Sequence, residues 1–243
     1  MIDIHTHILP GLDDGARDME DSLSMAALAL KSGVHTLVAT SHANTRGDFS
    51  KEYSIEEYLQ RLEAFRKALD EVKLPLRVFS GMEIYMTREV PRMIREGRLL
   101  SLNQTGYFLT EFSFGIEQEE MDEMLHDLME LGVTPVIAHP ERYRCVQESE
   151  SGIAKWKNRG CLLQVNRGSI FGRFGSGAKQ CVDRLLDQHM VTCIASDAHK
   201  PYERTTYMAD IKEYMEQEYS FEYSKKLLYD NPKRILEGEK VVQ

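Results

Sequence analysis

The chain has 243 residues, of which 42% are hydrophobic and 28% are charged, and its 39 acidic against 30 basic side chains give a formal net charge of −9. This composition is typical of a globular protein, and the acidic balance argues against general nucleic-acid binding, which depends on basic side chains. The longest apolar run, Met25 to Leu30, is far shorter than the roughly 20 residues that span a bilayer, and the first residues lack the features of a secretory signal.

The first expected strand begins near Ile2, and similar short apolar or β-branched runs recur about every 30 residues, the spacing of βαβ units. The later runs begin near Thr36, Leu76, Tyr107, Pro135, Leu162 and Val191. Strands that alternate with helices indicate a parallel α/β sheet, because parallel neighbours require a crossover connection. Seven such units, without a Gly-rich nucleotide loop after the first strand, favour a closed barrel. No linker or low-complexity tract interrupts them, so residues 1–243 are predicted to form a single domain.

Helical patterns fill the segments between these runs. Ser54 and Glu57, for example, form a capping box that predicts the start of a helix. From Arg204 onward the pattern is helical only. Two longer segments, 43–53 and 167–175, are predicted to be loops.

Six of the seven expected strands end in side chains that bind metal ions. The set is His5 and His7 with Asp14 just beyond, then His42, Glu83, Glu111, His139, and finally Asp197 and His199. Because parallel barrel strands direct their C-terminal ends to one face, we expect these side chains to meet there. Each taken alone is more often a cap or a solvated group, but five of the eight histidines fall at this rim.

The number and type of these side chains indicate the cofactor. Five imidazoles and four carboxylates exceed the about four ligands of one zinc ion, so two or three divalent ions that share carboxylates fit better. Nitrogen and oxygen ligands without a thiolate suit manganese, iron, zinc or magnesium. Apolar strands that repeatedly end in charge would be costly unless cations paired those groups.

Several motifs carry a family resemblance: Met1 to His7, Asp13-Asp14-Gly15, Thr40-Ser41-His42, Thr134 to Tyr143 and Ile194 to His199. They resemble the PHP (polymerase and histidinol phosphatase) superfamily, and more closely its bacterial protein-tyrosine phosphatases of the CpsB/YwqE class, which act in capsule and exopolysaccharide synthesis. The resemblance covers essentially the whole chain. It implies a distorted seven-stranded (βα)7 barrel, a trinuclear centre with manganese as the leading candidate, and a bacterial tyrosine kinase as the phosphorylated partner.

The resemblance also divides the ligands among three ions. His5, His7, Glu83 and Asp197 would hold the first, Glu83, Glu111 and His139 the second, and Asp14, His42 and His199 the third. By the same resemblance, Arg142 and Arg204 bind phosphate. A surface salt bridge is the alternative role for both arginines.

Divalent ions make water nucleophilic near neutral pH, so we expect direct attack of water on a phosphomonoester, with Arg142 and Arg204 binding its non-bridging oxygens. The rival route is a cysteinyl phosphate, and Cys161 and Arg167 have the required Cys-x5-Arg spacing. The residues between them are typical of a buried strand rather than a Gly-rich anion loop, which argues against that route. The four cysteines lack a C-x-x-C pair and are expected to be reduced thiols of a cytoplasmic protein.

Other functions remain open from the residues alone. A histidinol-phosphate phosphatase or another small phosphomonoesterase would use the same barrel and metals. TatD-like nucleases and amidohydrolases also begin with H-x-H, although amidohydrolases usually carry a carboxylated lysine where this chain has Glu111. A non-catalytic regulator that sequesters a phosphorylated partner would keep the same ligands. The choice of phosphotyrosine comes from the resemblance, and the 43–53 loop beside His42 is expected to shape access for a peptide.

Overall fold

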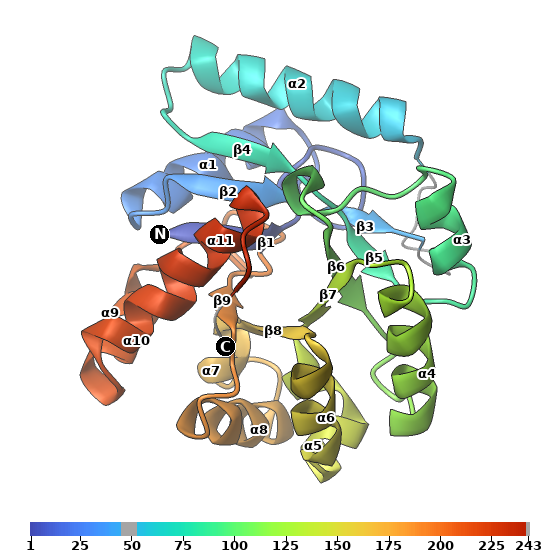
Figure 1. Ribbon diagram of the computed structural model, residues 1–243. Helices are drawn as coiled ribbons and strands as arrows, with labels where there is room; N and C mark the ends of the chain where they lie inside the picture. Colours follow the sequence, from blue (N-terminus) through green and yellow to red (C-terminus); the bar gives the residue numbers. More distant parts are fainter. Residues whose placement is uncertain (45–52, 242–243) are drawn as a thin grey trace.

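The computed structural model describes residues 1–44 and 53–241 as strands that alternate with helices (Figure 1). Within these ranges the strands are β1 (Ile2–Thr6), β2 (Thr36–Ala39), β3 (His42–Ala43), β4 (Arg77–Ser80), β5 (Glu83–Tyr85), β6 (Tyr107–Glu111), β7 (Thr134–Ala138), β8 (Leu162–Asn166) and β9 (Cys193–Ala195). Each strand pairs in parallel with its neighbours, in the orders β1-β2-β4 and β3-β5-β6-β7-β8-β9. The predicted parallel α/β architecture is confirmed.

Each of the seven predicted runs contains a strand, but two of the runs are divided. Thr40 and Ser41 separate β2 from β3, and Gly81 and Met82 separate β4 from β5. The described residues therefore form nine strands in two sheets, and the single closed sheet of seven is not confirmed. The chain after β9 nevertheless returns to β1, because an isolated parallel bridge pairs Thr6 with Ala198.

Helices surround the strands in Figure 1, with α2 over β4 and α4, α6 and α8 around the opposite side. The helices are α1 (Met19–Lys31), α2 (Ile55–Glu71), α3 (Val90–Arg95), α4 (Gln118–Met129), α5 (Arg144–Glu148), α6 (Ser151–Arg159), α7 (Arg167–Ile170), α8 (Ser176–Asp187), α9 (Ala209–Glu218), α10 (Phe221–Lys225) and α11 (Asn231–Glu237), with shorter turns η1 (Leu102–Gln104), η2 (Pro140–Arg142) and η3 (Lys226–Asp230). The predicted helical C-terminal part is confirmed.

Local sequence signals account for some of these boundaries. Ser54 caps α2 as predicted, because its side chain accepts a hydrogen bond from the backbone N–H of Glu57. The loop prediction for 167–175 is wrong in its first part, where α7 forms one short helical turn. Of the 43–53 loop, Ala43 instead belongs to β3, and 45–52 lie outside the described residues.

The apolar core has two parts on either side of the strands. The larger part packs the strands against the surrounding helices and includes Phe65 and Trp156, while the smaller part lies among the strands and includes Ile4 and Val136. Leu236 of α11 belongs to the smaller part, so α11 covers the N-terminal ends of the strands, at the front of Figure 1. The C-terminal ends are thereby left as the face on which a site can form.

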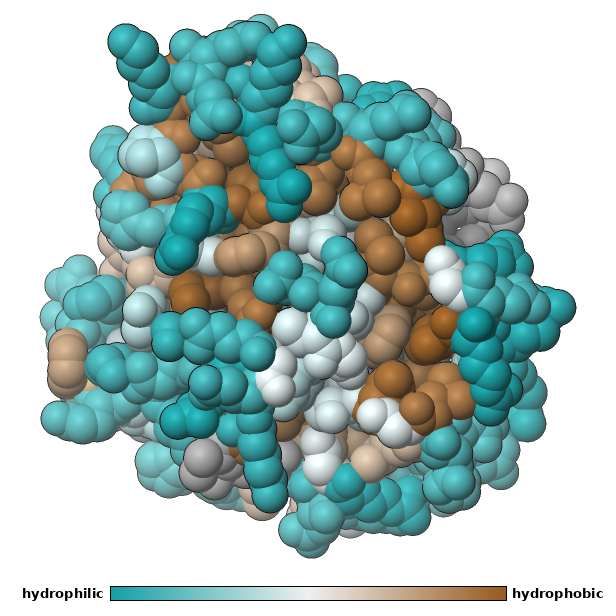
Figure 2. Space-filling view, turned by 45° about the horizontal axis from the view of Figure 1, so that its top comes forward, coloured by the Kyte–Doolittle hydropathy of each residue, from teal (hydrophilic) through white to brown (hydrophobic). Residues whose placement is uncertain are grey.

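Hydrophilic residues dominate the outline of the face in Figure 2, and apolar residues gather nearer its centre. In the part of the chain that the structure describes, no helix combines the length and apolar character needed to cross a membrane.

Candidate metal centre

Most of the nine predicted ligands lie at the C-terminal end of a strand or beyond it, while His42 and Glu83 are the first residues of β3 and β5, just after the breaks that follow β2 and β4. His5 belongs to β1, and the register of the parallel pair β3 and β5 places His42 opposite Glu83. Glu111 is the last residue of β6, and His139 follows β7 directly. The structure thus brings the predicted set to one end of the strands, as the strand pattern indicates.

Glu83 lies at the centre of this set and is almost fully buried, with 1% of its surface exposed. Its Oε2 atom is 3.1 Å from His5 Nε2, 3.1 Å from His7 Nε2 and 3.1 Å from His42 Nδ1. Its Oε1 atom is 2.9 Å from His139 Nε2. Among the described residues, Glu83 Oε2 is nevertheless a buried oxygen without a hydrogen bond of acceptable geometry. A buried carboxylate oxygen in that state is costly unless a cation pairs it.

The tautomers of His5 and His7 show why a cation fits. His5 Nδ1 lies 2.7 Å from the amide oxygen of Gln164, and His7 Nδ1 lies 2.7 Å from a carboxylate oxygen of Asp13. Because amide and carboxylate oxygens only accept, both Nδ1 atoms carry a proton, and Nε2 is the ring nitrogen left to bind a metal ion once it is deprotonated. The two Nε2 atoms are only 3.2 Å apart. Converging lone pairs repel one another but are the donor arrangement that a divalent metal requires.

Three groups of side chains place one donor atom each within 4.8 Å of one another. The groups are His5, His7, Glu83 and Asp197; His42, Glu83 and Glu111; and His7, Asp14, His42 and His199. The first group is the one expected for the first ion, and the third adds His7 to its expected set. In the second group His42 stands where His139 was expected, although His139 Nε2 is 3.6 Å from Glu111 Oε1.

Burial and crowding shift the proton affinities at this centre. Burial, with the nearby carboxylates of Glu83 and Asp197, raises the pKa of Glu111 to about 9. Burial lowers the pKa of His139 to about 4, and burial likewise lowers the pKa of His199 to about 4. Neutral imidazoles at His139 and His199 and crowded carboxylates, held away from water, form an environment that bound cations stabilise.

Sequence reasoning missed the side chains that orient the ligands. Asp13 accepts hydrogen bonds from His7 Nδ1 and from the backbone N–H of His42, at 2.7 and 2.9 Å. On β8, the predicted strand without a ligand, Gln164 accepts from His5, and Asn166 donates to Asp197 Oδ2 at 2.6 Å. The period-two spacing of Gln164 and Asn166 was the available signal, since i and i+2 face the same side of a strand.

The backbone at the centre is locally constrained. His139, Asp197 and Arg204 have φ angles of 35°, 50° and 46°, in the left-handed region that non-glycine residues rarely occupy. A Cβ atom at Gly15 would lie 2.1 Å from the carbonyl oxygen of His7, so only glycine fits there. Such constraints persist where the surrounding structure fixes them, and they cluster at functional sites.

Both predicted arginines lie beside the centre and face Asp197. Arg204 Nη2 is 2.6 Å from Asp197 Oδ2, and Arg142 Nη1 is 3.6 Å from the same oxygen. Guanidinium groups beside a cation-binding cluster form a site for an anion such as phosphate.

The Cys-x5-Arg spacing does not form an anion loop. Burial raises the pKa of the Cys161 thiol to about 12, so a thiolate is disfavoured there. Arg167 donates to the carboxylate of Asp210 on α9, with Nε 2.8 Å from Oδ1. The structure agrees with the sequence argument against a cysteinyl-phosphate route.

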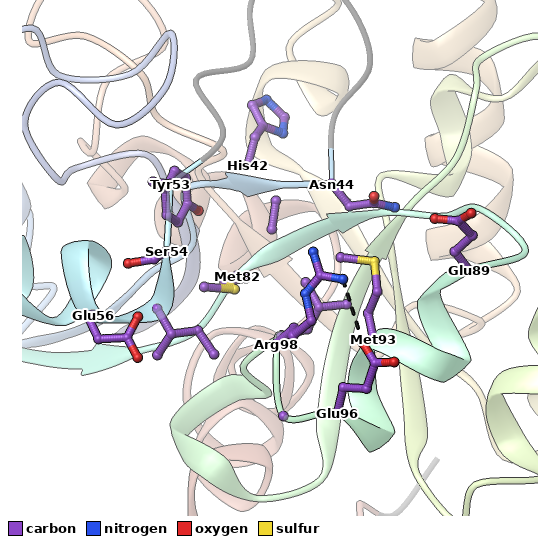
Figure 3. Close-up of a pocket in the computed structure, with 14 residues that line it drawn as sticks. His42, Asn44, Tyr53, Ser54, Glu56, Met82, Glu89, Met93, Glu96 and Arg98 are labelled. Atoms are coloured by element: carbon purple, nitrogen blue, oxygen red, sulfur yellow. Dashed lines mark ion pairs between the residues drawn. The ribbon is translucent and has the colours of Figure 1, made fainter.

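A cavity of about 650 Å³ adjoins β3 and is lined by β3 itself, the start of α2, Met93 of α3 and the segment after α3 (Figure 3). His42 borders it, but in Figure 3 the ring of His42 points away from Met93 and Arg98, which lie beneath the strand. Arg98 pairs there with Glu96 at 3.6 Å. Among the residues that the structure describes, His42 is the one candidate ligand that lines the cavity, so the cavity borders the centre without containing it.

Comparisons with known proteins agree with this geometry. The family described as capsular polysaccharide synthesis, CpsB/CapC, matches residues 1–237. Tyrosine-protein phosphatase YwqE of Bacillus subtilis is 35% identical over 241 residues, which cover 99% of this chain and 93% of that protein. Tyrosine-protein phosphatase CpsB of Streptococcus pneumoniae is 32% identical over 243 residues, which cover 97% and 98% of the two chains.

A solved structure from the same group of proteins also matches this chain over its full length. It comes from work on YwqE from Bacillus subtilis and CpsB from Streptococcus pneumoniae, described as unique metal-dependent tyrosine phosphatases. It matches this chain with a TM-score of 0.91 and 34% identity, over 100% of this chain and 96% of that one. The chain belongs to the CpsB/CapC family of capsular polysaccharide synthesis.

Proposed function

We propose that this chain is a metal-dependent protein-tyrosine phosphatase. The observation that carries the proposal is the convergence of imidazoles on the buried Glu83 oxygen, with Arg142 and Arg204 beside the same cluster. Relatives that are named tyrosine-protein phosphatases and align over nearly the whole chain support phosphotyrosine as the substrate.

In this proposal the metal ligands are His5, His7, Asp14, His42, Glu83, Glu111, His139, Asp197 and His199. They would hold two or three divalent ions, with manganese the first candidate and iron, zinc or magnesium the others. Such ions supply positive charge that makes water a nucleophile near neutral pH. Asp13 and Gln164 hold the rings of His7 and His5 in the tautomer that directs Nε2 into the centre.

The chain's own contribution to phosphate binding comes from the two arginines. Arg142 and Arg204 would bind the non-bridging oxygens of the phosphate, because a guanidinium presents paired N–H groups that match two such oxygens. A tyrosine leaving group, whose pKa is near 10, needs less protonation on departure than an alkoxide.

The wider context follows from the family. We propose a phosphorylated bacterial tyrosine kinase as the protein substrate, control of capsule or exopolysaccharide synthesis as the role, and the cytoplasm as the location. We also propose that β2 with β3, and β4 with β5, each act as one interrupted strand. The two sheets would then form the distorted seven-stranded barrel, with β1 beside β9.

The test uses purified protein loaded separately with manganese, iron, zinc or magnesium. A phosphotyrosyl peptide, its phosphoseryl counterpart and histidinol phosphate are compared as substrates, before and after chelation and metal restoration. We expect preferential hydrolysis of the phosphotyrosyl peptide, loss of activity on chelation and recovery on restoration. A preference for histidinol phosphate would assign the chain to the small-substrate phosphatases instead.

A pair of histidine variants separates the centre from general effects. His139→Ala should lose metal and activity, whereas His126→Ala should keep both, because the His126 side chain is 62% exposed on α4. Metal content is measured by mass spectrometry on the same samples. Full activity in protein shown to be free of metal would contradict the proposal.

A further inference from the structure

Arg142 lies between two aromatic rings at the edge of the metal centre. Its Cζ atom is 4.3 Å from the ring centroid of Phe114 and 4.3 Å from the ring centroid of Phe174. Phe114 follows β6, whereas Phe174 lies between α7 and α8, so two distant segments supply the rings. A guanidinium placed over an aromatic face is attracted by the negative potential of that face, and Arg142 has this contact twice.

This arrangement leaves the N–H groups of Arg142 available. Over residues 1–44 and 53–241, its guanidinium makes no hydrogen bond to the protein, and its ion pair with Asp197 is long at 3.6 Å. Arg204 differs, because its Nη2 atom lies 2.6 Å from Asp197. Ring faces hold a guanidinium without using its N–H groups, which project from the edge of the plane. Arg142 is thus fixed, only 18% exposed, and still able to donate to a ligand.

Phe174 has a constrained position of its own. A Cβ atom at Gly168 would lie 2.7 Å from Cε2 of Phe174, so the ring packs directly against the glycine of α7. Phe174 also lies near the second arginine, with Arg204 Cζ 5.6 Å from the ring centroid. The position of one ring therefore affects both guanidinium groups.

We propose that Phe114 and Phe174 are positioning residues that clamp Arg142 in the orientation that receives the phosphate group of the substrate. The rings would hold the guanidinium at a distance of 3.6 Å from the Asp197 carboxylate, too long for that carboxylate to occupy its donors. The inference rests on the proposed function, because it takes the ligand of Arg142 to be a phosphate.

The test measures phosphate binding separately from turnover. Inorganic phosphate is titrated calorimetrically into metal-loaded protein, and it is also tested as a competitive inhibitor of p-nitrophenyl phosphate hydrolysis. Phe114→Leu and Phe174→Leu keep apolar bulk but remove the ring face. Each should weaken phosphate binding by about two- to five-fold, the effect of losing one cation–π contact. KM should rise by the same factor with a smaller change in kcat, because the contact acts on bound phosphate throughout the reaction.

Two further comparisons separate a clamp from general structural damage. Phe114→Tyr keeps the ring face and should restore affinity to that of the unmodified protein. Phe171→Leu removes a 40% exposed ring of the same loop whose cation partner is Arg167, and it should leave phosphate binding unchanged. Gly168→Ala should weaken phosphate binding by displacing Phe174 without removing it. Metal content and melting temperature are recorded for every variant.

The decisive measurement is a double-mutant cycle with Arg142→Met. If the rings act through Arg142, Phe114→Leu should have no further effect on phosphate affinity in the Arg142→Met background, because in the described structure Phe114 contacts Arg142 and not Arg204. An equal loss in both backgrounds overturns the inference while leaving the proposed function intact, provided the unmodified protein hydrolyses phosphotyrosine. If the metal-loaded unmodified protein neither binds phosphate nor hydrolyses any phosphomonoester, the proposed function fails, and the clamp fails with it.

Discussion

Replacing Asp13 by asparagine tests whether the chain prepares its imidazoles for metal. The Asp13 carboxylate accepts from His7 Nδ1 at 2.7 Å, from the backbone N–H of His42 at 2.9 Å and from that of Gly15 at 2.9 Å. Asparagine has nearly the same shape but one accepting oxygen instead of two. At least one of the three donors must then face an NH2 group, and the charge that fixes the His7 tautomer is lost.

The expected loss of metal affinity follows from the contact of Asp13 with His7, a proposed metal ligand. Loss of a carboxylate that orients a metal-binding histidine typically weakens metal affinity by about 10- to 100-fold. At a fixed free metal concentration above the dissociation constant, this removes about 1.4–2.7 kcal/mol of metal-dependent stabilisation. For a chain of this size, the rise in melting temperature on metal addition should shrink by about 3–10 °C.

The assay is a competition titration with a chelator of known affinity, together with melting curves of the metal-free and metal-loaded forms. Asp183→Asn is the matched control, because Asp183 pairs only with Lys179 on the surface of α8 in the described structure. It should leave both readouts unchanged. Metal affinity in Asp13→Asn equal to that of the unmodified protein would refute the argument that the buried carboxylate sets the His7 tautomer.

Three shorter predictions address neighbouring features. Gly15→Ala should lower metal content and activity, measured on the purified variant, because its Cβ would lie 2.1 Å from the His7 carbonyl oxygen. Cys161→Ser should keep phosphatase activity within about two-fold, since a thiol whose pKa is raised to about 12 by burial is not a nucleophile; loss of turnover with metal retained would speak for the thiol. Phe65→Ala should cost about 3–5 kcal/mol in the free energy of unfolding by denaturant, because the ring is fully buried between α2 and the strands.

The strand positions and the clustering of the candidate ligands could be predicted because each depends on a local pattern. Apolar runs that end repeatedly in histidine or carboxylate are unusual, and the rule that parallel strands share a C-terminal face turns His5, Glu111 and Asp197 into neighbours. No knowledge of side-chain packing was needed for that step. The resemblance then supplied the division among ions, which stays a prediction; the structure brings together the four side chains of the first expected set, and His42 stands in place of His139 in the second.

The division of two strands could not be read in the same way. The break after β2 is accompanied by tertiary hydrogen bonds, from Thr40 N to the carbonyl oxygen of Thr6 and from Thr6 N to Thr40 Oγ1. At Gly81, a Cβ would lie 2.7 Å from Val38 Cγ1, so the second break lies where two segments approach closely. Both effects involve residues more than 30 positions apart in the sequence, which a local pattern does not contain.

The orienting residues were missed for a chemical reason. Asp13 and Asp14 are adjacent carboxylates, and only the turn beyond β1 determines that Asp13 faces His7 Nδ1 while Asp14 lies 3.3 Å from His199 Nε2. Gln164 and Asn166 are neutral amides on a strand without a ligand, so a search for charge passes over them. Phe174 lies in a segment whose only sequence signal is its glycines.

Asp197 connects the candidate metal ligands to the two arginines. Its Oδ1 atom faces the imidazoles, 3.4 Å from His5 Nε2 and 3.5 Å from His7 Nε2. Its Oδ2 atom faces the other way and lies 2.6 Å from Arg204 Nη2 and 2.6 Å from Asn166 Nδ2. The Asp197 carboxylate would therefore interact with a bound cation through Oδ1 and with the Arg204 guanidinium through Oδ2. Arg142 lies farther from the same oxygen, at 3.6 Å, and has two aromatic rings against its guanidinium, so the two arginines beside Asp197 have different supports.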